Sequence, residues 1–136
     1  MREIVEFIKK TPKAELHLHI EGTLEPNHLF KLAKRNHIPI PFSKVNEVKS
    51  AYNFSNLESF LNIFYQGSRV LIKEQDFFDL TWAYALKCKE ENIVHTEVFF
   101  DPQTHVNRGV KFDLVINGIH KALIKAQKEF GLTFRI

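Results

Sequence analysis

Residues 15–22, Glu-Leu-His-Leu-His-Ile-Glu-Gly, carry the side chains best suited to chemistry in this sequence. In an extended strand, alternate side chains point to opposite faces. This alternation predicts that His17 and His19 share one face, together with the carboxylates of Glu15 and Glu21. Two imidazoles two residues apart can converge on one metal ion, at zinc–nitrogen distances of about 2.0–2.1 Å. The neighbouring carboxylates could orient the imidazoles or contact a substrate.

A pair of histidines does not by itself complete a catalytic zinc site, which usually has about three protein ligands plus water. Further ligands would have to come from elsewhere. The Glu21-Gly22 turn follows the pair at the C-terminal end of the predicted strand, where parallel α/β folds build their sites. The competing interpretation is a polar layer in which His17 and His19 are hydrogen-bonded to carboxylates.

The other histidines and the single cysteine are weaker candidates. His105 follows the second predicted strand, so it could lie near the site or stabilise a loop through a hydrogen bond. His28 and His120 fall on predicted helices and are expected at the surface. Cys88 lies in a helical pattern, which predicts a small buried or half-buried side chain rather than a nucleophile.

These candidates depend on strands that alternate with helices. The sequence predicts strands over residues 14–20, 93–100 and 132–136. The predicted helices lie before Pro12, after Pro26, from a Ser55–Glu58 capping box onward, over residues 74–91, and over 112–130 with Gly131 as C-cap. Aromatic residues of the third of these helices are expected in the core: Phe60, Phe64 and Tyr65. Strands separated by helices predict parallel pairing through right-handed crossovers.

Composition fits one small globular domain. The chain has 136 residues, 44% of them hydrophobic, and its 19 basic and 16 acidic residues give a net charge of +3. The basic residues are scattered, which disfavours nucleic-acid binding. No apolar run approaches the roughly 18 residues that a membrane span needs. With one cysteine and no signal-peptide pattern, a cytoplasmic location is expected.

The pattern of the first strand favours a barrel. Strands of open parallel sheets are apolar on both faces, whereas one apolar face and one face of polar ligands fits a barrel with its site at the strand ends. Three strands cannot close such a barrel, which typically takes about 250 residues, and the sequence ends within a predicted strand. The expected fold is therefore α/β: the N-terminal part of a (β/α)8 TIM-type barrel of the metal-dependent hydrolase type, incomplete in this chain.

A resemblance sharpens this expectation. Residues 11–24, Thr-Pro-Lys-Ala-Glu-Leu-His-Leu-His-Ile-Glu-Gly-Thr-Leu, strongly resemble the first-strand motif of the adenosine/adenine deaminase family in the amidohydrolase superfamily. Residues 56–61, 74–77 and 97–105 resemble its later segments. The resemblance implies a zinc-dependent barrel enzyme that hydrolyses the 6-amino group of a small-molecule purine. Residues 1–136 would then be the first two βα units, a helical insertion and the start of the third strand.

Three residues can be carried over from the family motif. His17 and His19 match the two first-strand metal ligands. Glu21 stands where adenosine-acting members usually have an Asp that contacts the ribose, which makes it the expected substrate-binding residue. A Glu here, together with residues 101–105, Asp-Pro-Gln-Thr-His, resembles the adenine deaminase branch. Its extra methylene would fill ribose space, a difference worth about 1–3 kcal/mol.

The rest of the family's machinery lies on later strands. It comprises a third metal-binding His with a nearby proton-donating Glu, a catalytic His, and a metal-binding Asp beside a substrate-binding Asp. No catalytic residue is therefore assigned within this chain, and the isolated chain is expected to be inactive. The alternatives are an adenosine deaminase, another metal-dependent hydrolase, and an inactive truncated remnant; the oligomeric state is left open.

Overall fold

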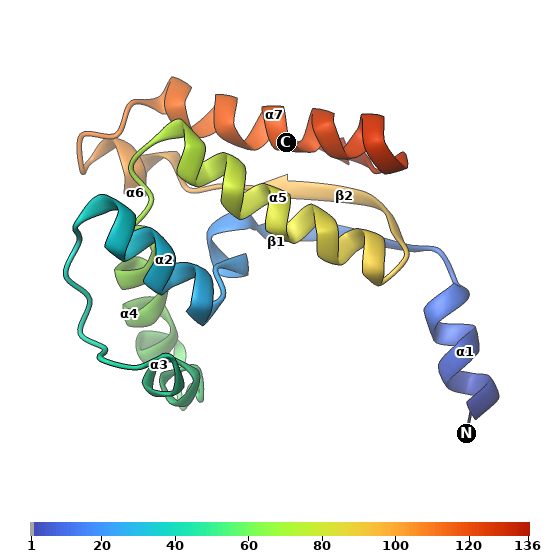
Figure 1. The fold of residues 1–136 in the computed structure, drawn as a ribbon, viewed down its shortest axis with the longest axis horizontal. Coiled ribbons are helices and arrows are strands. Elements are labelled where there is room, and N and C mark those ends of the chain that lie inside the picture. Colours follow the sequence, from blue (N-terminus) through green and yellow to red (C-terminus); the bar gives the residue numbers. More distant parts are fainter. Residues whose placement is uncertain (1) are drawn as a thin grey trace.

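The computed structural model describes residues 2–136 as a three-stranded parallel sheet with helices on one face (Figure 1). The elements follow in the order α1 (Arg2–Lys10), β1 (Lys13–His19), the 3₁₀-helix η1 (Ile20–Thr23), α2 (Pro26–Asn36), α3 (Val45–Ala51), α4 (Leu57–Ser68), α5 (Glu74–Glu90), β2 (Ile93–Phe99), α6 (Pro102–Val106), α7 (Phe112–Phe130) and β3 (Thr133–Arg135). The sheet order β1-β2-β3 and its pairing confirm the predicted parallel arrangement of the strands.

The core lies between the sheet and helices α5 and α7. Phe77 and Leu80 of α5 and Ile119 of α7 are fully buried there. The two helices pack closely at Gly118, where an added Cβ would lie 2.4 Å from the Glu74 carbonyl oxygen and 2.7 Å from the Phe77 Cβ. The predicted helix over residues 112–130 is confirmed as α7, as is Gly131, which ends the helix at φ 76° in the left-handed region.

A β-bulge in β1 changes one prediction. Glu15 pairs with Thr96 and Leu18 pairs with Val98, so three steps on β1 match two on β2. The extra residue reverses the alternation of side chains along the strand. Glu15 consequently faces α5, where its Oε2 accepts a hydrogen bond of 2.7 Å from the Tyr84 hydroxyl. The prediction that Glu15 shares a face with the two histidines is therefore wrong.

The structure also differs from the predicted helices and strands at several other places. The strand stops at His19 and residues 20–23 form η1, while α3 and the five-residue α6 were not predicted. Asn56, not Ser55, caps α4 by accepting a hydrogen bond from the Ser59 amide. Phe60 and Tyr65 of α4 are exposed, so their predicted place in the core is wrong.

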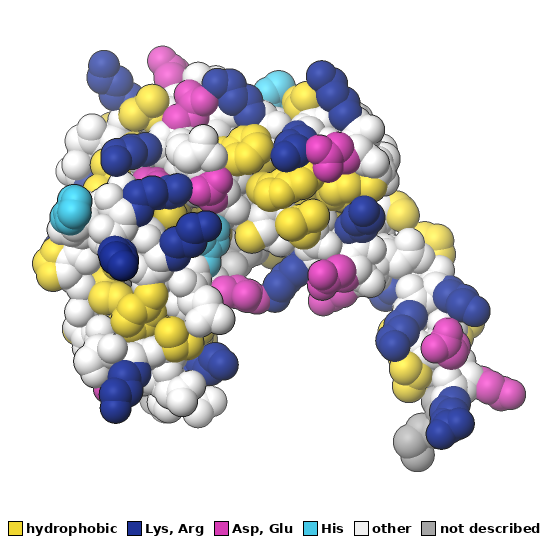
Figure 2. Space-filling view, in the orientation of Figure 1, with side chains coloured by type: hydrophobic (Ala, Val, Ile, Leu, Met, Phe, Trp, Pro, Cys, Tyr) yellow, Lys and Arg dark blue, Asp and Glu magenta, His cyan; other side chains and the backbone are white. Residues whose placement is uncertain are grey.

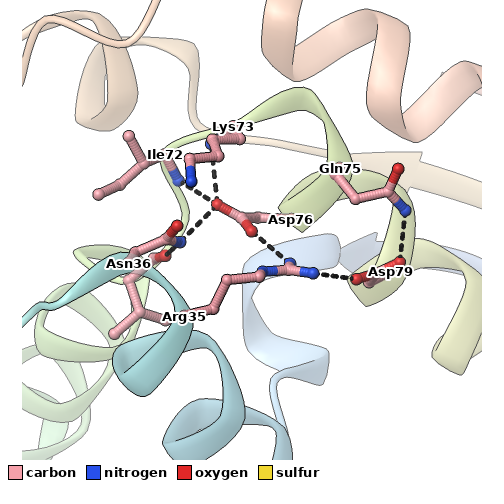
Figure 3. A network of polar contacts seen from close by, with 8 residues as sticks. Arg35, Asn36, Ile72, Lys73, Gln75, Asp76 and Asp79 are labelled. Atoms are coloured by element: carbon pink, nitrogen blue, oxygen red, sulfur yellow. Dashed lines mark hydrogen bonds and ion pairs between the residues drawn. The ribbon is translucent and has the colours of Figure 1, made fainter.

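A polar network fixes α2 against the start of α5 (Figure 3). The buried Asp76 carboxylate accepts hydrogen bonds from Arg35, from the Asn36 side chain and from the amides of Ile72 and Lys73. Arg35 also donates 2.7 Å to Asp79. Because Lys73 is the N-cap of α5 and Asp76 lies three residues after it, Asp76 closes the start of α5 and at the same time holds α2 through Arg35 and Asn36.

Helix α1 lies apart from the rest of the chain (Figures 1 and 2). Its apolar side chains, including Ile4, Phe7 and Ile8, are largely exposed. In the same space-filling view, hydrophobic side chains also gather along α5. Among residues 2–136, no helix is long and apolar enough to cross a membrane.

Candidate functional site

His17 and His19 lie side by side at the C-terminal half of β1. Their ring centroids are 5.5 Å apart, and both rings stack against Phe99, at 4.5 Å and 5.8 Å. Phe99 lies opposite His19 in the register of β1 and β2. The three side chains therefore project from one face of the sheet, the face away from α5 and α7, and the part of the prediction that pairs the two histidines is confirmed.

The spacing of the two imidazoles fits a shared metal ion. For zinc–nitrogen distances of about 2.0–2.1 Å and a tetrahedral angle, two ring centroids lie roughly 5 Å apart. The observed 5.5 Å is close to that separation. Within residues 2–136, however, no group of three or more His, Cys, Asp or Glu side chains could hold a metal ion. The described residues thus offer two imidazole donors, half of a four-ligand set.

Glu21 follows this pair in η1, beyond the end of β1, so it does not lie on the strand face where alternation predicted it. The η1 turn carries its side chain into the interior, where only 4% of the residue is exposed. One carboxylate oxygen, Oε1, accepts hydrogen bonds of 2.8 Å from the Asp101 amide and from His105 Nε2. The other oxygen, Oε2, is buried and has no hydrogen-bond partner among the described residues. Glu21 therefore connects the end of β1 with the segment that follows β2.

His105 is a site residue rather than an ordinary loop residue. It lies in α6, is fully buried, and packs edge-on against Phe77 at a centroid distance of 4.9 Å. Arg108 lies 2.8 Å from its other nitrogen, Nδ1. The predicted loop-stabilising hydrogen bond is confirmed, and one of these contacts joins His105 to Glu21, the proposed substrate-binding residue.

Arg108 was not identified from the sequence. Burial lowers its pKa, and the positive charge of Arg69 adds to that effect. Its guanidinium donates to backbone oxygens of Arg69, Leu71 and Thr104. Its position in the sequence could have identified it as a partner of His105, because a residue three positions after His105 faces the same side of a helical turn.

The remaining candidates lie elsewhere. Cys88 is fully buried, and burial raises the pKa of its thiol to about 11, which agrees with an inert cysteine. His120 is exposed and His28 is half-buried on α2. A groove of about 850 Å³ opens between β1, α2 and α5, on the face that carries Glu15, and neither histidine of the pair lines it.

Comparisons with known proteins agree with this geometry. The family described as Adenosine deaminase matches residues 12–136. A protein from Wolinella succinogenes named adenine deaminase is 59% identical over 133 residues, which are 98% of this chain and 40% of that protein. The chain spans about 40% of the length of the curated relatives it matches.

Solved structures of deaminases and amidohydrolases contain a part with the same fold as this chain. The crystal structure of adenine deaminase from Arthrobacter aurescens matches with a TM-score of 0.87 and 43% identity, over 90% of this chain and 38% of that one. An amidohydrolase from Burkholderia ambifaria, solved with bound Zn, matches with a TM-score of 0.82 over 96% of this chain and 36% of that one. At 22% identity the latter shows the fold alone. The predicted fold, the N-terminal part of a TIM-type barrel, is confirmed.

Proposed function

The chain belongs to the adenosine deaminase family, and we propose on that premise that it is the N-terminal part of an adenine deaminase. The reaction is hydrolysis of the 6-amino group of adenine to give hypoxanthine and ammonia. The observation that carries the proposal is the 59% identity, over nearly the whole chain, to a protein named adenine deaminase. The cytoplasmic location remains a prediction.

In this proposal His17 and His19 hold a zinc ion. Their shared face and their 5.5 Å ring separation support that role. Zinc, when bound, acts as a Lewis acid and lowers the pKa of a coordinated water to about 7. Phe99 stacks on both rings and restricts their orientation.

Glu21 is the proposed contact to the purine. It follows the histidine pair by two residues, its carboxylate is buried, and its Oε2 is an acceptor with no partner among the described residues. Carboxylates accept hydrogen bonds and do not donate them when ionised, so the group it contacts must carry an N–H or O–H. This chain's own contribution is thus to hold the metal and orient the substrate. The groups that transfer protons are expected in the remainder of the barrel.

Adenosine deamination is the second candidate, because the matching family is described as Adenosine deaminase. Two observations favour adenine. By the family resemblance, Glu21 stands where adenosine-acting members usually have a shorter Asp, and it is fixed there by His105 and Asp101. The curated relatives at 52–59% identity are also named adenine deaminase.

The test is a hybrid protein that joins residues 1–136 of this chain to the remainder of the Wolinella succinogenes adenine deaminase. We expect this hybrid to release ammonia from adenine, and we expect a double variant with His17→Ala and His19→Ala to lose both the activity and the bound zinc. His28→Ala with His120→Ala is the matched control and should retain both. A folded hybrid that releases no ammonia from adenine would contradict the proposal.

A further inference from the structure

The hydrogen bonds around His105 fix the position of its proton. An arginine side chain only donates hydrogen bonds, so Arg108, 2.8 Å from Nδ1, must donate to that nitrogen. Nδ1 is therefore the acceptor, and a neutral imidazole then carries its proton on Nε2. Nε2 lies 2.8 Å from Glu21 Oε1. The direction of donation runs from Arg108 to His105 and from His105 to Glu21.

The two carboxylate oxygens of Glu21 differ in the number of hydrogen bonds that they accept. Oε1 accepts two hydrogen bonds, one from His105 and one from the Asp101 amide. Oε2 is equally buried but accepts none among the described residues. A buried polar atom without a partner is costly, and native proteins seldom leave one unless it serves a ligand or a water.

We propose, building on the proposed function, that His105 and Arg108 are positioning residues which hold Glu21 so that Oε2 accepts a hydrogen bond from an N–H of the purine substrate. Neither residue touches the substrate. Arg108 selects the tautomer of His105, and His105 then holds Oε1, so that the carboxylate cannot rotate. The ligand class is a purine whose ring or amino group presents an N–H toward Glu21.

The anchoring of Arg108 supports this assignment. Its guanidinium is held by backbone oxygens of Arg69 and Leu71 on the segment after α4 and of Thr104 in α6. Phe77 of α5 packs edge-on against the His105 ring. Three separate segments thus hold the pair in place. Outer contacts of this kind around a functional carboxylate typically change affinity or activity by about 10–100-fold when removed.

The tautomer can be measured on the 136-residue chain itself, from the ¹⁵N chemical shifts of the His105 ring. We expect a protonated Nε2 and an unprotonated Nδ1. Arg108→Gln should change this signature, because the guanidinium donor is lost. Arg69→Gln, which removes a neighbouring positive charge but keeps the backbone oxygen that Arg108 uses, should not. A proton on Nδ1 in the unsubstituted chain would overturn the proposal.

Kinetics of the hybrid protein test the role toward the purine. Glu21→Gln is the sharpest variant, since the two donors at Oε1 require the amide oxygen to take that position and the amide N–H₂ to replace Oε2. An acceptor thereby becomes a donor. We expect the KM for adenine to rise about 10–100-fold, with a smaller change in kcat. Arg108→Gln should raise KM in the same direction, and Arg69→Gln should leave it unchanged.

The possible outcomes distinguish a failure of the proposed function from a failure of the positioning role of His105 and Arg108. A variant that is merely misfolded lowers the active fraction and hence kcat, while its KM stays the same. If the unsubstituted hybrid releases no ammonia from adenine, the proposed function fails. If the hybrid is active and its KM for adenine is unchanged in both Glu21→Gln and Arg108→Gln, the positioning role is overturned while the proposed function stands.

Discussion

His105 and Glu21 are 84 positions apart in the sequence, and they meet with Nε2 of the imidazole 2.8 Å from the carboxylate Oε1. Both side chains are completely buried. This contact joins the turn after β1 to the segment after β2, at the carboxyl ends of two neighbouring parallel strands. It places the proposed substrate-binding residue at the end of the strand that carries His17 and His19, in the part of the fold where barrel enzymes build their sites.

Zinc binding by the isolated chain should be weak and should depend on the histidine pair. Two imidazoles supply half of the ligands of a structural site, which with four ligands reaches about 10–16 kcal/mol. Calorimetric titration of His17→Ala with His19→Ala should show that most specific zinc uptake is lost. His28→Ala with His120→Ala should leave it intact. Equal uptake by the two double variants would mean that the pair is not preorganised.

The isolated chain should have no measurable deaminase activity. It offers two proposed metal ligands and one proposed substrate contact but no assigned proton-transfer group. Catalytic groups that act as a unit lose most of their effect when the set is incomplete. The measurement is ammonia release from adenine by the purified 136-residue chain with added zinc. Turnover that persists through purification and disappears in the His17→Ala, His19→Ala variant would refute this expectation.

Gly118→Ala should destabilise the chain. Its new Cβ would lie 2.4 Å from the Glu74 carbonyl oxygen and 2.7 Å from the Phe77 Cβ, so α5 and α7 would have to separate. Overpacking of this kind costs about 1–3 kcal/mol. Urea denaturation gives the free energy of unfolding, and Gly67→Ala, whose Cβ would meet only Leu24 at 3.5 Å, is the helical control. A neutral Gly118→Ala would mean that the two helices pack less closely.

Features that depend on residues close together in the sequence could be predicted, whereas features that depend on contacts between distant segments could not. The apolar periodicity that forms α7 and the Gly131 cap that ends it depend on neighbouring residues, and the sequence predicted both. The bulge before Leu18 depends on how β1 pairs with β2, so the orientation of Glu15 could not be derived from alternation alone. Arg108 was missed for a similar reason, because its role arises only when α6 folds against residues that precede α5.

Acid should weaken the link between α2 and α5. Burial raises the pKa of Asp79, but the hydrogen bonds from Arg35 and Gln75 outweigh it, and the net pKa is lowered. A lowered folded-state pKa stabilises the chain above the ordinary Asp value of about 3.9, and this contribution is lost as the pH falls through the folded value. Asp79→Asn should therefore reduce the free energy of unfolding at pH 7, and its difference from the unsubstituted chain should shrink on acidification.

The control for this effect is Glu90→Gln, which removes an exposed carboxylate in the last turn of α5. Urea denaturation of the three proteins between pH 7 and pH 3 gives the comparison. A difference between Asp79→Asn and the unsubstituted chain that stays constant over this range would show that the carboxylate contributes nothing through its charge.

The most direct measurement is the ratio of kcat/KM for adenine to kcat/KM for adenosine in the hybrid protein that carries residues 1–136. We expect a ratio well above one, because Glu21, which stands where adenosine-acting members of the family are expected to have a shorter Asp, is fixed by His105 and Asp101. We further expect Glu21→Asp to lower the ratio, since the removed methylene is worth about 1–3 kcal/mol. A hybrid that prefers adenosine would contradict the assignment of this chain to an adenine deaminase.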